Sequence, residues 1–324
     1  MTALPVSAWL VATLLSGAAC GPQQRQETPN GDSTVLAERE ARLAQAIAHP
    51  DSGAASGGAI ARWLLPPELN EVSGLALTAD GRLLTHGDQR GQVFEIDYRR
   101  GVAIKQFALG KPTVHDDFEA ITVVGDTVVL LASNGTLYMF QEGANDARVE
   151  YTVHNTNLGR ECEFEGLAFD PAIRALLLAC KNVGMKSLRD SLVIFRWKLD
   201  GGQTSRLSKL TVPLGQVIGS NGWDGLHPSD ITLDPFNGNY VIIASREQAL
   251  VEITPAGKVV FARPLPGKHA QPEGVAITRD SILIISDERS TGATAKHAHR
   301  GSMDESAVLT LYRWPLARVG PVVP

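Results

Sequence analysis

The sequence has few cysteines, no excess of basic charge and almost no long apolar runs. Its 30 Lys and Arg face 35 Asp and Glu, which gives a net charge of −5 at pH 7. Binding to phosphates needs a basic face, so no nucleic-acid partner is expected. The sequence also lacks the Gly-x-Ser-x-Gly turn of many serine hydrolases and a Gly-rich phosphate-binding loop. Beyond the first 20 residues, no run approaches the roughly 18 apolar residues that span a bilayer. Any membrane attachment is therefore expected through the N-terminus.

The first 20 residues have the pattern of an export signal. An apolar stretch from Ala8 to Leu15 precedes small residues and Cys20, as in a bacterial lipoprotein signal, where the cysteine is acylated. The lead has no Lys or Arg, and Gly17 stands where leucine is usual, so ordinary cleavage after Ala19 and a cytoplasmic start are the alternatives. The pattern predicts a signal peptide over residues 1–20, lipidation of Cys20, and a place in a bacterial cell envelope, periplasmic or surface-facing.

Residues 21–59 are predicted to form a tether and a helical spacer. Residues 21–31 have the composition of a solvated chain. Residues 32–49 mix Ala, Leu, Glu and Arg in a way that favours a helix, and the Pro and Gly that follow end it. Such a segment would hold a folded body off a membrane, and a pro-segment is the alternative.

Two cysteines, Cys162 and Cys180, remain after Cys20. In an oxidising compartment they could form a disulfide. If the chain turns around residues 171–174, however, Cys180 lies across from Glu165 and not from Cys162. Two buried free thiols are therefore at least as good an interpretation.

One short motif occurs five times, and the rest of the chain is organised around it. Its copies are separated by 46, 46, 64 and 44 residues, the differences between the numbers of the residues at one repeated position: Ser73, Glu119, Glu165, Ser229 and Glu273. A period of this size is typical of propeller blades or of a solenoid. Each copy opens a series of short strands bounded by Gly, Asn-Gly or Pro, which indicates repeated small sheets.

These repeats predict an all-β fold, a single β-propeller over residues 60–324. In the first repeat the expected strands, one four-stranded blade, cover residues 72–77, 82–85, 92–97 and 102–108. The last repeat has only three strands, whereas the strand Ala61–Pro66 has no blade of its own. We expect this N-terminal strand to complete the last sheet and close the ring. Five motifs predict five blades, and a sixth would require degenerate sheet over residues 214–225.

The repeated position is the candidate functional centre. In a propeller the innermost strand of each blade begins at the central channel, so Glu119, Glu165 and Glu273 would face one another, with Ser73 and Ser229 in the other two places. Three carboxylates in a channel with low-dielectric walls repel one another unless protonation or a bound cation relieves the repulsion. An all-oxygen donor set suits a hard ion, and calcium fits a flexible multi-blade site best. A purely structural role between blades and a catalytic role are the alternatives.

Two further sets of polar residues are expected around the mouth of this channel. One lies two residues before each repeated position: Glu71, Asp117, Glu163, His227 and Gln271. The other follows the second strand of each repeat: Asp88, Ser133, Lys181, Glu247, and Asp287 with Glu288. They predict a polar, mostly acidic face that could bind a ligand.

Several of these motifs resemble the SdiA-regulated family of exported bacterial propellers. The matching segments, in the same order over roughly residues 60–315, are Phe164–Ala168 preceded by Cys162, Asp117–Ile121 and Gln271–Ala276. The resemblance implies a propeller with a metal-compatible centre and a poorly defined biochemical role. The likeness to phytase-like and lactonase-like propellers is one of fold and acidic centre.

Two functional hypotheses follow. The first is a non-enzymatic, exported and lipid-anchored propeller that binds a divalent cation, calcium favoured, through Glu119, Glu165 and Glu273. Its open face would bind an unknown small molecule or envelope protein. The second is a calcium-dependent hydrolase of phosphoester or lactone bonds, with Glu163 or His227 as the proton-transfer group.

Overall fold

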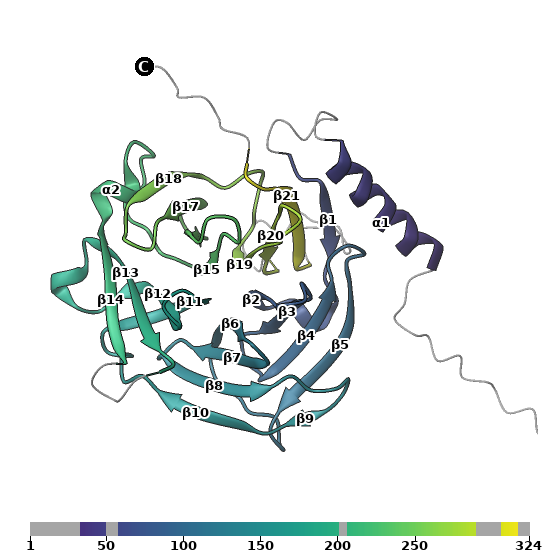
Figure 1. Ribbon diagram of the computed structural model, residues 1–324, viewed down its shortest axis with the longest axis horizontal. Coiled ribbons are helices and arrows are strands. Elements are labelled where there is room, and N and C mark those ends of the chain that lie inside the picture. The colour runs from purple at the N-terminus through teal and green to yellow at the C-terminus, as the bar shows by residue number, and fades with distance from the viewer. Residues whose placement is uncertain (1–32, 50–57, 201–205, 290–305, 317–324) are drawn as a thin grey trace, which may run out of the picture.

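Five sheets stand around a common axis, and each presents its innermost strand to the centre (Figure 1). This computed structural model describes residues 33–49, 58–200, 206–289 and 306–316. The predicted signal peptide, Cys20 and the segment 21–31 lie outside the described residues. The expected all-β propeller with five blades is confirmed.

Each blade is built from its innermost strand at the axis outwards. Blade 1 holds β2 (Val72–Leu77), β3 (Leu83–Gly87), β4 (Gln92–Asp97) and β5 (Val102–Leu109), to which the short β9 (Arg148–Val149) adds in parallel. Blade 2 holds β6 (Phe118–Val124), β7 (Thr127–Ala132), β8 (Thr136–Gln141) and β10 (Tyr151–Asn155). Blade 3 holds β11 (Cys162–Asp170), β12 (Ala175–Val183), β13 (Ser191–Lys198) and β14 (Leu207–Pro213). Blade 4 holds β15 (Asp230–Leu233), β16 (Tyr240–Ala244), β17 (Ala249–Ile253) and β18 (Val259–Pro264). Blade 5 holds β19 (Pro272–Ile277), β20 (Ile282–Asp287), β21 (Val308–Arg313) and β1 (Ala61–Leu64).

The N-terminal strand closes the ring, as the sequence predicts. β1 pairs antiparallel with β21, from Ala61 opposite Leu311 to Leu64 opposite Val308. The stretch that could have hidden a sixth blade begins with the short helix α2 (Leu214–Ile218) and has no strand among its residues 219–225. The closed ring therefore has five blades.

The second strand of each blade is apolar because blades cover it on both sides. In β16 all five side chains are buried, and in β12 the run Ala175–Cys180 is buried throughout. Such continuous apolar runs are typical of strands without a solvated face. This packing holds the inner strands, and hence the residues at their starts, in fixed positions.

The helix that the sequence favours before the propeller is present and packs against it. Helix α1 (Ser33–Ala48) buries Leu43 in the same apolar cluster as Leu65 and Leu311. Glu40 pairs with Arg100 of blade 1 at 2.7 Å. None of the described helices is both long and apolar enough to span a bilayer. The helix is thus held against the propeller surface (Figure 1).

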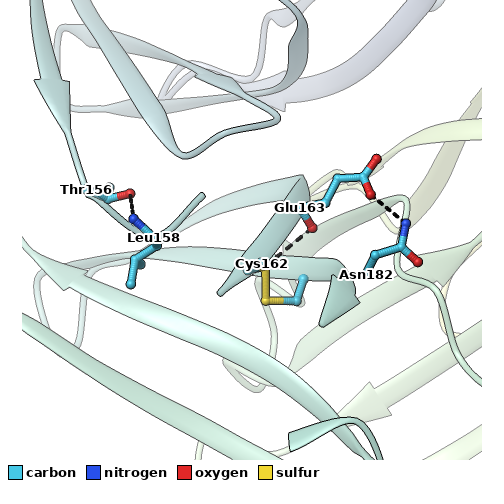
Figure 2. The surroundings of a disulfide bond; sticks show 6 residues. Thr156, Leu158, Cys162, Glu163 and Asn182 are labelled. Atoms are coloured by element: carbon cyan, nitrogen blue, oxygen red, sulfur yellow. Dashed lines mark hydrogen bonds between the residues drawn. A yellow bond between two sulfur atoms is a disulfide. The ribbon is translucent and has the colours of Figure 1, made fainter. Parts of the chain in front are cut away.

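Cys162 and Cys180 form a disulfide, whose surroundings Figure 2 shows. The expectation that Cys180 lies across from Glu165 was wrong, because the register shifts around Phe164. Phe164 pairs with Cys180 and Gly166 with Ala179, so Glu165 is an extra residue without a partner in the ladder. The two cysteines are therefore bonded to each other in this structure and are not free thiols.

Candidate functional site

The repeated residues sit on β-bulges at the starts of the inner strands. Ladder pairing skips one residue between Val72 and Gly74, and the same shift recurs in blades 2, 3 and 5. The skipped residues are Ser73, Glu119, Glu165 and Glu273. A bulge bends the strand and re-aims the side chain of the extra residue, a device common beside functional sites. The fifth residue, Ser229, immediately precedes β15.

The bulges bring the three carboxylates of Glu119, Glu165 and Glu273, hereafter the glutamate ring, into mutual electrostatic contact. Ser73 Oγ lies 3.5 Å from Glu119 Oε2. Lys181, expected only at the rim, extends from β12 so that its Nζ donates to Glu165 Oε1. The centre therefore consists of three acids that share one ammonium group.

Burial perturbs the protonation of all three acids. It raises the pKa of Glu119 and of Glu165 to about 8 and that of Glu273 to about 7. Repulsion between the carboxylates adds to this effect, and the charge of Lys181 opposes it. Burial lowers the pKa of Lys181, but the bond to Glu165 and the other two carboxylates raise it more, so the net direction is upward. Near neutral pH the glutamate ring is therefore partly protonated around a charged lysine.

The glutamate ring offers the carboxylate oxygens that calcium takes as ligands, but its three acids are not arranged as a metal site in this structure. Glu165 is 5 % exposed, and its Oε2 is buried with no hydrogen-bond partner among the described residues. Such an orphaned oxygen is suited to a proton, a water or a cation. Within residues 33–49, 58–200, 206–289 and 306–316, however, no three acidic, His or Cys side chains stand close enough to hold a metal ion. An ion would require Lys181 to move away from Glu165.

A second acidic group lies between blades 1 and 5. Burial and the charge of Glu71 raise the pKa of Asp88 to about 6. Burial, Asp88 and Glu71 likewise raise the pKa of Glu288. Gln89 Nε2 donates to Glu71 at 3.2 Å, and Gln271 Nε2 donates to Glu288. The structure thus brings Glu71 and Asp88 together as expected neighbours on this face.

His227 and Glu247 form a fixed pair on blade 4. Nδ1 of His227 lies 2.7 Å from Glu247 Oε1, and the His227 backbone N–H donates to Glu247 Oε2 at 3.0 Å. A guanidinium nitrogen of Arg246 lies 3.5 Å from Nε2. The carboxylate therefore fixes both the position and the ring orientation of His227.

The other face residues divide into exposed and buried ones. Glu163 is exposed and accepts a hydrogen bond from Asn182 at 2.6 Å (Figure 2). Asp117 is also exposed and accepts from Ser133 at 2.5 Å.

Asp287 and Ser229 do not reach the face. Asp287 is 2 % exposed and pairs with His269 Nδ1 at 2.7 Å. Ser229 is buried, and its hydroxyl donates to the carbonyl oxygen of Pro272 at 2.7 Å. Ser229 therefore links blades 4 and 5 and is unavailable to a ligand.

Sequence reasoning missed Asp230, which fills the axis directly below the glutamate ring. Its side chain is 0 % exposed and accepts 2.8 Å hydrogen bonds from the amides of Ile231 and Val275. The backbone amides of Leu167 and Leu75 also interact with this carboxyl group and lower its pKa. These donors come from four inner strands, so the carboxyl group lies where the strands converge. Burial raises its pKa well above the usual range, and the amides oppose that shift.

A signal for Asp230 exists in the repeat itself. The position after the repeated residue is small in every blade but the fourth: Gly74, Ala120, Gly166, Asp230 and Gly274. A Cβ on Gly274 would lie 2.7 Å from Leu75 Cγ, and one on Gly166 would lie 3.1 Å from the nitrogen of Ile231. Four small residues thus leave room for a single side chain. Asp230 is the one exception at this position of the repeat, and its side chain fills the space on the axis.

A closed ring of five four-stranded blades around an acidic centre defines a five-bladed β-propeller. The model of the SdiA-regulated family matches residues 217–308, which confirms the resemblance carried by the motifs. No curated protein matches the sequence.

Solved structures with a similar course of the chain are remote in sequence. Myxococcus xanthus glutaminyl cyclase is 12% identical, with 78% of this chain and 94% of that chain covered and a TM-score of 0.51. The PQQ-bound aldose sugar dehydrogenase from Streptomyces coelicolor is 14% identical, with 78% and 98% covered and a TM-score of 0.47. A streptogramin B lyase is 17% identical, with 70% of this chain and 65% of that chain covered and a TM-score of 0.40. At such identities the likeness concerns the fold alone.

Proposed function

We propose that this protein is a ligand-binding propeller that binds a divalent cation, with calcium favoured, at the glutamate ring. One observation carries the proposal: three carboxylates share a single ammonium, and the buried Oε2 of Glu165 has no partner among the described residues. Carboxylate oxygens are the ligands that calcium prefers. Glu119, Glu165 and Glu273 would hold the ion, whose charge would replace that of Lys181 and of the protons retained at raised pKa.

Calcium uptake at this site should compete with Lys181 and with protons. Metal ligands must be deprotonated, so affinity should rise as the pH passes through the pKa values of about 7 and 8. Removing the ammonium by Lys181→Gln leaves the acids without their internal counter-charge. This variant should bind calcium more tightly than the wild type, a result that a purely structural lysine would not give.

Isothermal titration with calcium chloride at pH 8 tests the proposal. We expect saturable binding to the wild type, tighter binding to Lys181→Gln, and loss of binding in Glu165→Gln. Glu163→Gln is the matched control, because Glu163 lies two residues away on β11 but is exposed and bonded to Asn182. Absence of calcium binding in both the wild type and Lys181→Gln would refute the metal proposal.

A hydrolase is the second candidate, favoured by the His227–Glu247 pair. A carboxylate that fixes an imidazole is a common arrangement for proton transfer. Calcium-dependent turnover of p-nitrophenyl phosphate or of a simple lactone, lost in His227→Asn and in chelator, would establish this activity. Equal rates in the wild type and in His227→Asn would exclude His227 as the proton-transfer group.

We further propose that the protein is exported and anchored through Cys20. The disulfide between Cys162 and Cys180 supports an oxidising compartment, because such bonds are rare in reducing cytoplasm. Metabolic labelling with palmitate tests the anchor: the wild type should be labelled and Cys20→Ser should not. An unlabelled but exported wild type would favour ordinary cleavage.

The proposed partner of the face around Glu71, Asp88, Asp117 and Glu247 is a small molecule or an envelope protein. The grouped carboxylates of Glu71 and Asp88 favour a cationic group on that partner.

A further inference from the structure

The end of the axis opposite the glutamate ring carries a depression that the proposed function does not use. Its volume is about 470 Å³, within the range of small-molecule sites. Every inner strand contributes at least one apolar side chain to its wall, and those toward the strand ends are Leu77, Val123, Phe169, Leu233 and Ile277. Asp230, fully buried on the axis, separates this depression from the acidic end. The depression is therefore separate from the glutamate ring.

The charge available in this depression is positive. Among the described residues that line it, two are ionisable, Asp234 and Arg279. Asp234 is almost fully buried, and its oxygens accept bonds from Trp314 Nε1 at 3.0 Å, the Phe236 amide at 2.8 Å and Asn237 Nδ2 at 3.0 Å. Arg279 is exposed and has no hydrogen bond or ion pair with any described residue. Its guanidinium remains free to bind an anion.

The apolar surface continues past the rim beside this guanidinium. Pro235 lines the depression, and the following Phe236 is 56 % exposed. The hydroxyl of Thr232 also lines the wall and has no partner among the described residues. The site thus combines an apolar wall, the hydroxyl groups of three threonines and one unpaired positive charge.

We propose that this depression binds a small amphipathic carboxylate. Its apolar body would cover the five strand-end side chains, and its carboxylate would pair with Arg279, whose planar group matches a carboxylate in a bidentate way. A single unpaired guanidinium balances a single negative charge. The propeller would then have two sites of opposite preference, a cation at one end of the axis and an organic anion at the other.

Calorimetric titration with decanoate, below its micelle concentration and in the presence of EDTA, tests this site. EDTA removes calcium from the glutamate ring, so the outcome does not depend on the first proposal. We expect saturable binding of one decanoate, weakened at least tenfold in Arg279→Gln. Ala79→Trp should abolish it without lowering the melting temperature, because Ala79 is exposed and lines the depression.

Two controls make the result specific. Arg160→Gln removes an exposed arginine from the loop before β11, at the acidic end, and should bind decanoate as the wild type does. Decyltrimethylammonium has the same chain with the opposite charge and should not bind. The proposal is overturned if decanoate does not saturate, if Arg279→Gln binds like the wild type, or if the cationic probe binds equally well.

Discussion

Replacing Asp230 by alanine should destabilise the whole ring, because this carboxyl group accepts amides from several blades at once. The substitution leaves the amides of Ile231 and Val275, each at 2.8 Å, buried without an acceptor. A buried donor left unpaired costs about 1–3 kcal/mol, so the two together cost roughly 2–6 kcal/mol. Loss of the interaction with the amides of Leu75 and Leu167 adds to this. Asp230→Asn keeps one oxygen but turns an N–H₂ group toward amide donors, and we expect about half the loss.

Urea-induced unfolding followed by tryptophan fluorescence at pH 7 measures these differences. Asp126→Ala is the control, because Asp126 is exposed in the turn between β6 and β7 and should change the free energy of unfolding by less than about 0.5 kcal/mol. The order of stability should be wild type, Asn variant, Ala variant. If Asp230→Ala unfolds at the same urea concentration as the control, the reasoning about the axis is wrong.

Three further outcomes are expected. In calcium-free buffer the melting temperature should fall as the pH rises from about 4.5 to about 8. The reason is that the pKa values of Glu119, Glu165 and Glu273 in the folded protein, about 8, 8 and 7, lie above the unfolded value of 4.5. A melting temperature that does not change over this pH range would contradict these pKa values. Replacing Cys162 and Cys180 together by serine should lower the free energy of unfolding by about 3 kcal/mol, since the disulfide closes a loop with a sequence separation of 18. A reductant should lower the stability of the wild type and leave that of the double variant unchanged. Tyr240→Phe removes a buried 2.6 Å hydrogen bond to Asp170 and should lower the free energy of unfolding in urea by about 1–3 kcal/mol. Tyr151→Phe is the control, because the Tyr151 hydroxyl has no such bond to a described residue. A similar loss of stability in both variants would show that the hydrogen bond is not the cause.

The regular parts of the fold could be predicted because they depend on local pattern. In the first repeat, strands β2 and β4 have the predicted bounds, since each is a short apolar or alternating run between turn residues. The closure by β1 followed from counting strands in the last repeat. The repeated position identified the glutamate ring for a similar reason, because equal places in equal repeats lie around one axis.

The finer arrangement of the site depends on contacts between distant segments. Lys181 reaches the glutamate ring because its side chain is long and β12 lies beside β11. Asp287 turns inward because His269, from another segment, provides its partner. A local register shift places Phe164, and not Glu165, opposite Cys180. None of these contacts follows from a periodic pattern in the sequence.

Closure by β1 has a consequence for how the molecule is made. Ala61 pairs with Leu311, 250 residues later (311 minus 61), so the first strand of the propeller is synthesised well before the last strand, with which it pairs. During synthesis, four blades can be complete while the fifth still lacks β21, the strand that joins β20 to β1. Until β21 leaves the ribosome, β1 remains an unsatisfied edge, and any chain that stops before residue 308 stays an open arc.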